Sequence, residues 1–120
     1  MSSQKHVGQQ GESIAVQHLE QKQYLILARN WRHQHGEIDI IAWHNDVLVF
    51  AEVKTRRSSN TDDSLPNFTP RKRTALLQAI YHYLDQHQIS DVTWRLDLIA
   101  VAIPPQGQPL IDHLEDALEW

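Results

Sequence analysis

Hydrophobic and polar residues follow two different periods along the chain. Over residues 8–23 the apolar side chains recur at helical spacing, and the face directed inward contains positions 12, 15, 16 and 19. The later segments have the alternation, or the short continuous apolar runs, that are typical of strands. The predicted order is a helix over 8–23, strands over 24–32, 37–43 and 46–56, a helix over 69–87 and a strand over 92–103.

Turn and cap signals separate these elements. Thr69 and Pro70 match the N-cap and first-turn residues of a helix, and they set the start of the second helix. The polar segment 57–68 predicts a long mobile loop. After the last long strand, a short strand or turn near 109–112 and a brief helix through Leu114 and Leu118 complete the chain.

The order αβββαβ, with no internal repeat, predicts a single α/β domain over residues 1–120. One mixed sheet would lie between helices on its two faces. The strand over 46–56 is longer and more continuously apolar than its neighbours, as expected for a central strand that is covered on both sides. A chain of this length buries roughly two-thirds of its unfolded surface, so the core needs no disulfide or metal to form.

Four charged residues interrupt two of these apolar strands, and they are Glu37, Asp39, Glu52 and Lys54. Alternation places Glu52 and Lys54 on one face of the strand over 46–56. It places Glu37 and Asp39 on one face of the preceding strand, opposite Ile38 and Ile40. The four charges can therefore share one face of the sheet if the two strands pair in the right register.

That register depends on the hairpin loop between the two strands. A loop of Asn45 and Asp46 places Asp39 directly opposite Glu52. A loop of His44 and Asn45 instead places Asp39 diagonal to Glu52, still on the same face. A loop with an odd number of residues and no bulge would send the two carboxylates to opposite faces.

Neighbouring carboxylates in a buried position need a compensating positive charge. Lys54 is one candidate, and a divalent cation is a better one, because carboxylate oxygens, carbonyls and waters are the ligands that Mg²⁺ and Mn²⁺ prefer. Glu12, at the head of the first helix's inward face, could supply a third carboxylate. Taken singly, Glu52 and Lys54 also match a strand end in solvent, and Glu12 matches a residue favoured by the helix dipole.

Composition and charge narrow the function classes. The chain has no cysteine, which excludes disulfides and thiolate metal sites, and no apolar run long enough for a signal peptide or a membrane span. We therefore expect a cytoplasmic protein without a membrane partner. The formal net charge is −4, yet six of the eleven Lys and Arg residues fall between positions 54 and 73: Lys54, Arg56, Arg57, Arg71, Lys72 and Arg73. Such a local basic patch suits a nucleic-acid backbone.

Several motifs together resemble a known family. An Asp in one strand, Glu-x-Lys in the next and a Glu on the preceding helix resemble the PD-(D/E)xK, or restriction-endonuclease-like, nuclease superfamily. More narrowly, the chain resembles the YraN-type family of small bacterial predicted endonucleases, which is similar in core to archaeal Holliday-junction resolvases. The motifs that carry this resemblance are Gly11-Glu12, "RNWR" at 29–32, "GEIDIIA" at 36–42, "LVFAEVKTR" at 48–56 and "RLDLIAV" at 95–101.

The resemblance implies a metal-dependent endonuclease that hydrolyses phosphodiester bonds, with branched or otherwise structured DNA as the expected substrate. It implies that Asp39 and Glu52, with the carbonyl of Val53, bind Mg²⁺ or Mn²⁺. Lys54 would help to activate the attacking water, and Glu12 would be an accessory acid. Arg56, Arg57, Arg71, Lys72 and Arg73 would contact the nucleic-acid backbone. A resolvase-like role would favour a twofold dimer.

Two other interpretations remain open at this point. The chain could be a non-catalytic module that binds nucleic acid or a partner protein on a nuclease fold. It could also be a structural protein whose charges form an internal ion-pair network. Arg95 and Asp97 share a face of the last long strand, and we expect them to pair with each other rather than to take part in catalysis.

Overall fold

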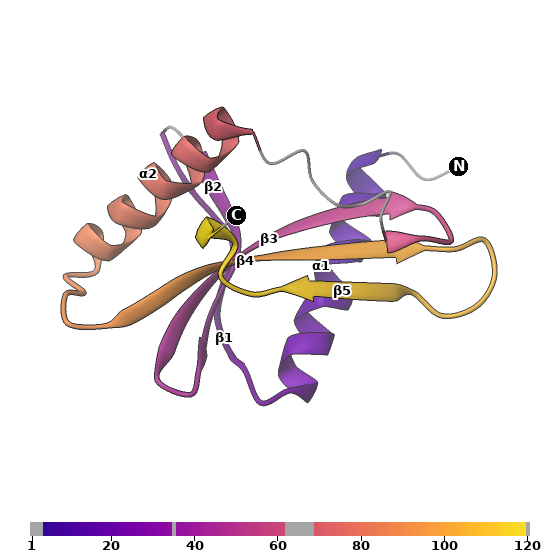
Figure 1. The fold of residues 1–120 in the computed structure, drawn as a ribbon, viewed down its shortest axis with the longest axis horizontal. Coiled ribbons are helices and arrows are strands. Elements are labelled where there is room, and N and C mark those ends of the chain that lie inside the picture. Colours follow the sequence, from indigo (N-terminus) through magenta and orange to yellow (C-terminus); the bar gives the residue numbers. More distant parts are fainter. Residues whose placement is uncertain (1–3, 35, 62–68, 120) are drawn as a thin grey trace.

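The chain folds into one mixed sheet with a helix on each face (Figure 1). The computed structural model describes residues 4–34, 36–61 and 69–119. Most of the loop predicted over 57–68 lies outside these ranges. The elements are α1 (Gln4–Gln21), β1 (Leu25–His33), β2 (Gly36–His44), β3 (Val47–Arg57), α2 (Pro70–Gln86), β4 (Thr93–Ile103), β5 (Leu110–Leu114) and the 3₁₀ helix η2 (Ala117–Glu119).

The five strands lie in the order β1-β2-β3-β4-β5. Neighbouring strands run antiparallel except β3 and β4, which are parallel and are joined through α2. A parallel pair needs such a crossover connection. The predicted α/β class, the mixed sheet and the central place of β3 are confirmed.

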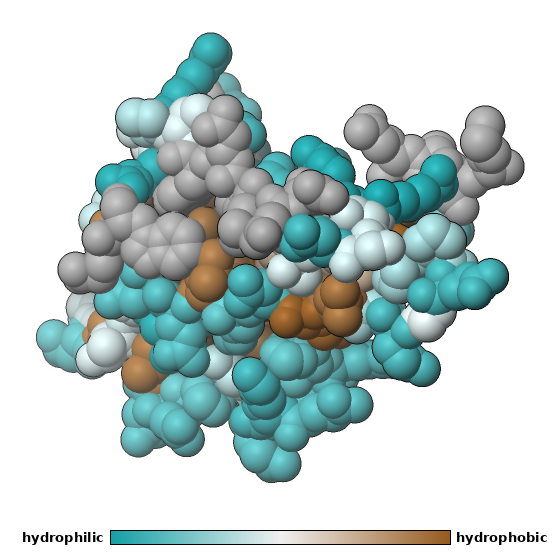
Figure 2. Space-filling model, turned by 45° about the vertical axis from the view of Figure 1, so that its right-hand side comes forward, coloured by the Kyte–Doolittle hydropathy of each residue, from teal (hydrophilic) through white to brown (hydrophobic). Residues whose placement is uncertain are grey.

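Two separate hydrophobic clusters hold the helices to the sheet. The first contains Ala15 and Leu19 of α1 with one set of strand residues, and the second contains Leu76 and Ile80 of α2 with the other set. The face shown in Figure 2 is mostly hydrophilic, with hydrophobic residues in small separate areas. No helix in the described part of the chain is long and apolar enough to cross a membrane.

Local signals placed the start of α2 correctly. The Thr69 side chain accepts a hydrogen bond from the backbone N–H of Lys72 at 3.2 Å, and Pro70 is the first helical residue. At the other ends, the structure corrects the predictions. The first helix begins at Gln4 rather than near residue 8, and Leu114 belongs to β5, so that the last helix contains only Ala117–Glu119.

The β2–β3 hairpin has a two-residue loop. Asn45 and Asp46 have φ angles of 50° and 66°, which is the left-handed pair that a tight type I′ hairpin requires. The ladder pairs His44 with Val47 and continues to Ile40 with Ala51. The loop of Asn45 and Asp46, whose register sets Asp39 opposite Glu52, is therefore confirmed as far as the pair Ile40–Ala51, and the alternative loop of His44 and Asn45 is wrong.

The strict alternation predicted for β2 is wrong at one position. Ile40 belongs to the cluster under α1, whereas Ile38 and Ile41 both belong to the cluster under α2. In a regular strand Ile38 and Ile40 would face the same side. The strand changes its facing between them, at Asp39.

α1 crosses β3 at an unusually short distance. A Cβ atom added to Gly11 would lie 1.8 Å from Oγ1, 2.6 Å from Cγ2 and 2.7 Å from Cβ of Thr55. Only a glycine fits against a threonine at this separation. Gly11 therefore sets how closely the residue after it, Glu12, approaches the end of β3.

We predict that Gly11→Ala lowers the free energy of unfolding by about 2 kcal/mol or more, because the new methyl overlaps Thr55. Gly8→Ala on the same helix is the matched control, since nothing lies within 4 Å of its added Cβ. It should raise the stability by about 0.5–1 kcal/mol through helix propensity. Chemical denaturation of the purified variants measures both changes.

A second substitution tests the cause of the loss. Thr55→Gly removes all three overlapping atoms and should restore much of the stability of Gly11→Ala, whereas Thr55→Ala leaves the Cβ at 2.7 Å and should restore little. Equal stability of the Gly11→Ala and Gly8→Ala proteins would show that the contact does not constrain the helix.

Candidate functional site

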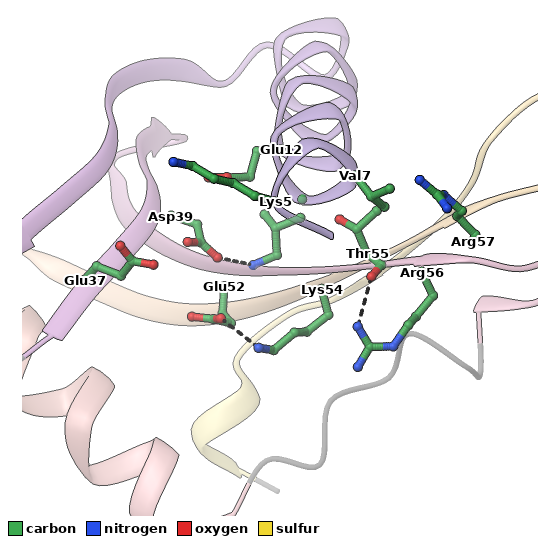
Figure 3. Close-up of a pocket in the computed structure, with 12 residues that line it drawn as sticks. Lys5, Val7, Glu12, Glu37, Asp39, Glu52, Lys54, Thr55, Arg56 and Arg57 are labelled. Atoms are coloured by element: carbon green, nitrogen blue, oxygen red, sulfur yellow. Dashed lines mark hydrogen bonds and ion pairs between the residues drawn. The ribbon is translucent and has the colours of Figure 1, made fainter. Parts of the chain in front are cut away.

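A cleft of about 620 Å³ opens where α1, β2 and β3 meet (Figure 3). Glu12 of α1 and the four charged strand residues all line this cleft, and Figure 3 shows Glu12, Asp39 and Glu52 reaching it from three different elements. The residues that line it are Lys5, Val7, Gly8, Glu12, Glu37, Asp39, Glu52, Val53, Lys54, Thr55, Arg56 and Arg57. The structure thus brings all four predicted catalytic residues into one cleft.

Asp39 is the centre of this arrangement. Its side chain is only 8% exposed, and Oδ2 accepts a hydrogen bond from the backbone N–H of Val53 at 2.8 Å. The β2–β3 ladder of the described residues ends one step earlier, at the pair Ile40–Ala51. Since strand N–H groups lie in the plane of the sheet, the carboxylate lies between the two strands, where a backbone carbonyl would otherwise accept.

Glu52 and Lys54 lie on the neighbouring strand. The Lys54 Nζ is 3.5 Å from Glu52 Oε1, and their side chains are 33% and 18% exposed, respectively. Lys54 therefore compensates part of the acidic charge, as one of the sequence interpretations expected. The ion pair of Lys54 is with Glu52, whereas Asp39 accepts from the Val53 N–H through Oδ2.

Glu12 reaches the cleft from α1. Its Oε1 atom is buried and has no hydrogen-bond partner among the described residues. Burying a carboxylate oxygen without a partner is costly. A cation bound beside the other two carboxylates would satisfy this orphaned oxygen.

Burial and the charge of Asp39 disfavour ionisation of the carboxylates in the cleft. Burial, and after it the charge of Asp39, raises the pKa of Glu12 to about 7. The same two causes raise the pKa of Glu52 to about 7, although Lys54 opposes the change. Burial also raises the pKa of Asp39, against the effect of the Val53 hydrogen bond. Near neutral pH the site therefore holds more negative charge than its protein surroundings stabilise.

The donor set fits a hard divalent cation in type and charge. Carboxylates with raised pKa values and an unpartnered oxygen are what Mg²⁺ or Mn²⁺ would stabilise. Within the described ranges, however, no three acidic or histidine side chains already form a closed metal-ligand group. The carboxylates share a cleft, and side-chain rotation would be needed to bring Glu12, Asp39 and Glu52 onto one ion.

The predicted nucleic-acid-binding residues divide into three groups. Arg56 and Arg57 line the main cleft. Lys72 lines a second cavity of about 190 Å³ on the α2 side, which shares Glu37, Glu52 and Lys54 with the main cleft. The remaining two predicted residues, Arg71 and Arg73, are not among the described residues that line either cavity.

Sequence reasoning missed several cations that lie near the carboxylates. Lys5 lines the cleft from α1. On β1, Arg29 donates from Nη2 to Ser13 Oγ at 3.2 Å, and the Nε of Arg32 is 2.9 Å from Oε2 of Glu37. Both arginines act to lower the pKa of Glu12. The signal was present in "RNWR", but only the pairing of β1 with β2 brings it to the site.

The expected Arg95–Asp97 pair is confirmed, and it belongs to a buried polar network. The Asp97 side chain is fully buried and accepts from Arg95 Nε at 2.9 Å and from the Asp116 N–H at 3.1 Å. His113 Nε2 lies 2.7 Å from its other oxygen. These bonds lower the pKa of Asp97 despite its burial. The network fastens the C-terminal segment to β4 and leaves no oxygen of Asp97 open to a ligand.

Comparison with known proteins places the chain in a family. The model of "Uncharacterised protein family UPF0102" matches residues 11–101, from Gly11 to Val101, which includes every lining residue from Glu12 onward. A UPF0102 protein of Geotalea uraniireducens is 37% identical over 115 residues, which cover 96% of this chain and 91% of that protein. One from Kineococcus radiotolerans is 39% identical over 109 residues, covering 90% and 89%. The chain therefore belongs to the UPF0102 family.

Proposed function

We propose that the protein is a metal-dependent endonuclease with a restriction-endonuclease-like fold, acting on branched or otherwise structured DNA. The observation that carries this proposal is the buried carboxylate of Asp39 and the partly buried one of Glu52, both with raised pKa values, beside Lys54 in an open cleft. Such an arrangement costs folding free energy, which favours a functional reason for it. The antiparallel β1-β2-β3 unit followed by α2 and a parallel β4 agrees with the expected fold.

The chain's own residues would divide the work as follows. Asp39 and Glu52 would hold the cation together with the carbonyl of Val53, and Glu12 would complete the donor set. When bound, Mg²⁺ or Mn²⁺ would supply the Lewis acidity that phosphodiester hydrolysis requires. Lys54, beside Glu52, would orient the attacking water and stabilise the charge that develops on the phosphate.

The cations around the cleft would hold the nucleic acid. Arg56 and Arg57 are the last residues of β3, beyond its carboxylate, and line the main cleft. Lys72 of α2 lines the second cavity. We add Lys5, Arg29 and Arg32 to the predicted set because they approach the same cleft or act on Glu12. Contacts of this kind bind phosphates without reading the base sequence.

We predict that Mn²⁺ raises the melting temperature of the wild-type protein in the millimolar range, because a ligand bound only by the folded state stabilises it. Asp39→Asn should abolish the shift. The asparagine oxygen can still accept from the Val53 N–H, so the fold is retained. Glu20→Gln, an exposed change on α1, is the matched control and should leave the shift intact. Absence of any shift in the wild type would contradict the metal site.

A pH titration tests the crowded carboxylates without metal. The folded-state pKa of Glu52 is about 7 and its ordinary value is 4.5, so the folded protein holds the proton more tightly between these values. Its contribution to stability is therefore full below pH 4.5 and is lost as the pH rises to 7. Glu52→Gln should remove that loss and be about 1–3 kcal/mol more stable, relative to wild type, at pH 8 than at pH 4.5.

Denaturation curves across this pH range measure the difference, with Glu20→Gln again as the control. Saturating Mn²⁺ should weaken the wild-type decline, because a cation favours the ionised carboxylates. A constant difference between wild type and Glu52→Gln at all pH values would refute the raised pKa.

Cleavage assays test the activity itself. Asp39→Asn and Lys54→Ala should each reduce metal-dependent cleavage of branched or flap DNA by about 100-fold or more, with the melting temperature in the absence of metal little changed. Lys22→Ala, at an exposed position near the end of α1, should cleave like wild type. Wild-type inactivity on branched, flap and single-stranded DNA and on RNA would favour the non-catalytic binding module.

A further inference from the structure

Asn30, the second residue of "RNWR", lies directly across the sheet from Asp39. The β1–β2 ladder pairs Arg29 with Ile40 and Trp31 with Ile38. Asn30 of β1 and Asp39 of β2 lie between these two pairs and therefore face each other. Asn30 has a φ angle of 53°, in the left-handed region. It is exposed, so burial of its side chain does not explain this conformation.

Both strands change their facing at this level. On one side of it, Ile40 contacts the cluster under α1. On the other side, Ile38 packs into the cluster under α2, and on β1 Ala28 and Trp31, three residues apart, both pack into that same cluster. Regular strands would keep Ile38 and Ile40 on one face. The two strands keep one register and direction through this level, so the positive φ of Asn30 rotates the backbone and changes which face the following side chains take, and the paired strand β2 turns with it.

The reversal decides where Asp39 points. Continued alternation from Ile41, which packs under α2, would direct Asp39 toward the α2 side. Instead its Oδ2 accepts from the in-plane Val53 N–H at 2.8 Å, and Asp39 lines the cleft under α1 together with Glu12 but does not line the cavity on the α2 side. Asp39 thus faces the cleft that α1 covers.

We infer that Asn30 is a positioning residue whose left-handed backbone directs the Asp39 carboxylate into the cleft. The effect is exerted through the ladder between β1 and β2 and not through the amide group of the side chain. Asparagine and glycine adopt positive φ most readily. For alanine this conformation costs about 1 kcal/mol or more, and for β-branched residues the cost is highest. The role of Asp39 in metal binding rests on the proposed function. The position of its carboxylate is observed independently of that function.

The test uses Asn30→Gly, Asn30→Ala and Asn30→Val, with hydrogen exchange of the Val53 amide as the first readout. Asn30→Gly should keep the protection of this amide, because glycine keeps the left-handed conformation. Asn30→Val should reduce the protection about tenfold or more, since Asp39 no longer accepts from it, and Asn30→Ala should lie between. If Asn30→Val fails to fold, the Asn30→Ala and Asn30→Gly proteins still give the comparison.

Gln88→Val is the matched control for backbone strain. Gln88 has the same φ angle of 53° and is exposed after α2. It should lose stability like Asn30→Val while the Val53 amide stays protected. Wild-type protection in Asn30→Val, or equal loss in Gln88→Val, would overturn the inference.

The affinity for Mn²⁺, measured from the thermal shift, is the second readout. Asn30→Val should weaken it about 10-fold or more, as expected when a ligand's support is lost, while Asn30→Gly should stay within about threefold of wild type. If Mn²⁺ does not change the melting temperature of the wild-type protein, the proposed function is contradicted. The exchange of the Val53 amide would still decide whether Asn30 positions Asp39.

Discussion

The hydrogen bond from the Val53 N–H to Asp39 is the interaction on which the site depends. It lies where the β2–β3 ladder ends, so a side chain takes the place of a backbone acceptor and satisfies a buried donor. The same bond fixes one carboxylate oxygen of Asp39 beside Glu52. This one contact therefore serves both the fold and the site. It lets β2 and β3 stop pairing here without leaving the Val53 N–H unpaired, and the cleft lies where the pairing stops.

This arrangement stores unfavourable electrostatic energy. Burial raises the pKa values of Asp39, Glu52 and Glu12, the charge of Asp39 adds to the rise at Glu12 and Glu52, and Lys54 offsets only part of it at Glu52 and Asp39. The Asp97 network on the same sheet is the instructive contrast. Its buried carboxylate is surrounded by donors, and its pKa falls. One fold thus contains a carboxylate satisfied by protein and a group of carboxylates left short of positive charge, and the second is what a cation-binding site requires.

Two backbone features hold the acidic residues in place. The absence of a side chain at Gly11 lets α1 approach Thr55 and carries Glu12 to the cleft. The positive φ at Asn30 coincides with the change of facing at Asp39. Both residues lie in motifs near the acidic residues in the sequence. Gly11 allows a close approach of two elements, and Asn30 has a backbone conformation that few residue types adopt. The motif "GE" and the motif "RNWR" thus have separate physical explanations within one site.

The sequence by itself determined the features that depend on local chemistry. These are the α2 cap at Thr69, the central strand β3 and the Arg95–Asp97 pair, whereas two hairpin loops remained possible until the structure selected Asn45 and Asp46. Asp39, Glu52 and Lys54 could also be named, because charges in apolar strands stand out, and Glu12 because it lies on the inward face of the first helix. Only the tertiary structure decided the reversal at Asp39, the orphaned oxygen of Glu12 and the presence of Arg29 and Arg32 near the cleft. The reason is physical: caps and turns follow from a few neighbouring φ and ψ angles, whereas these contacts arise when strands and helices distant in the chain pack together.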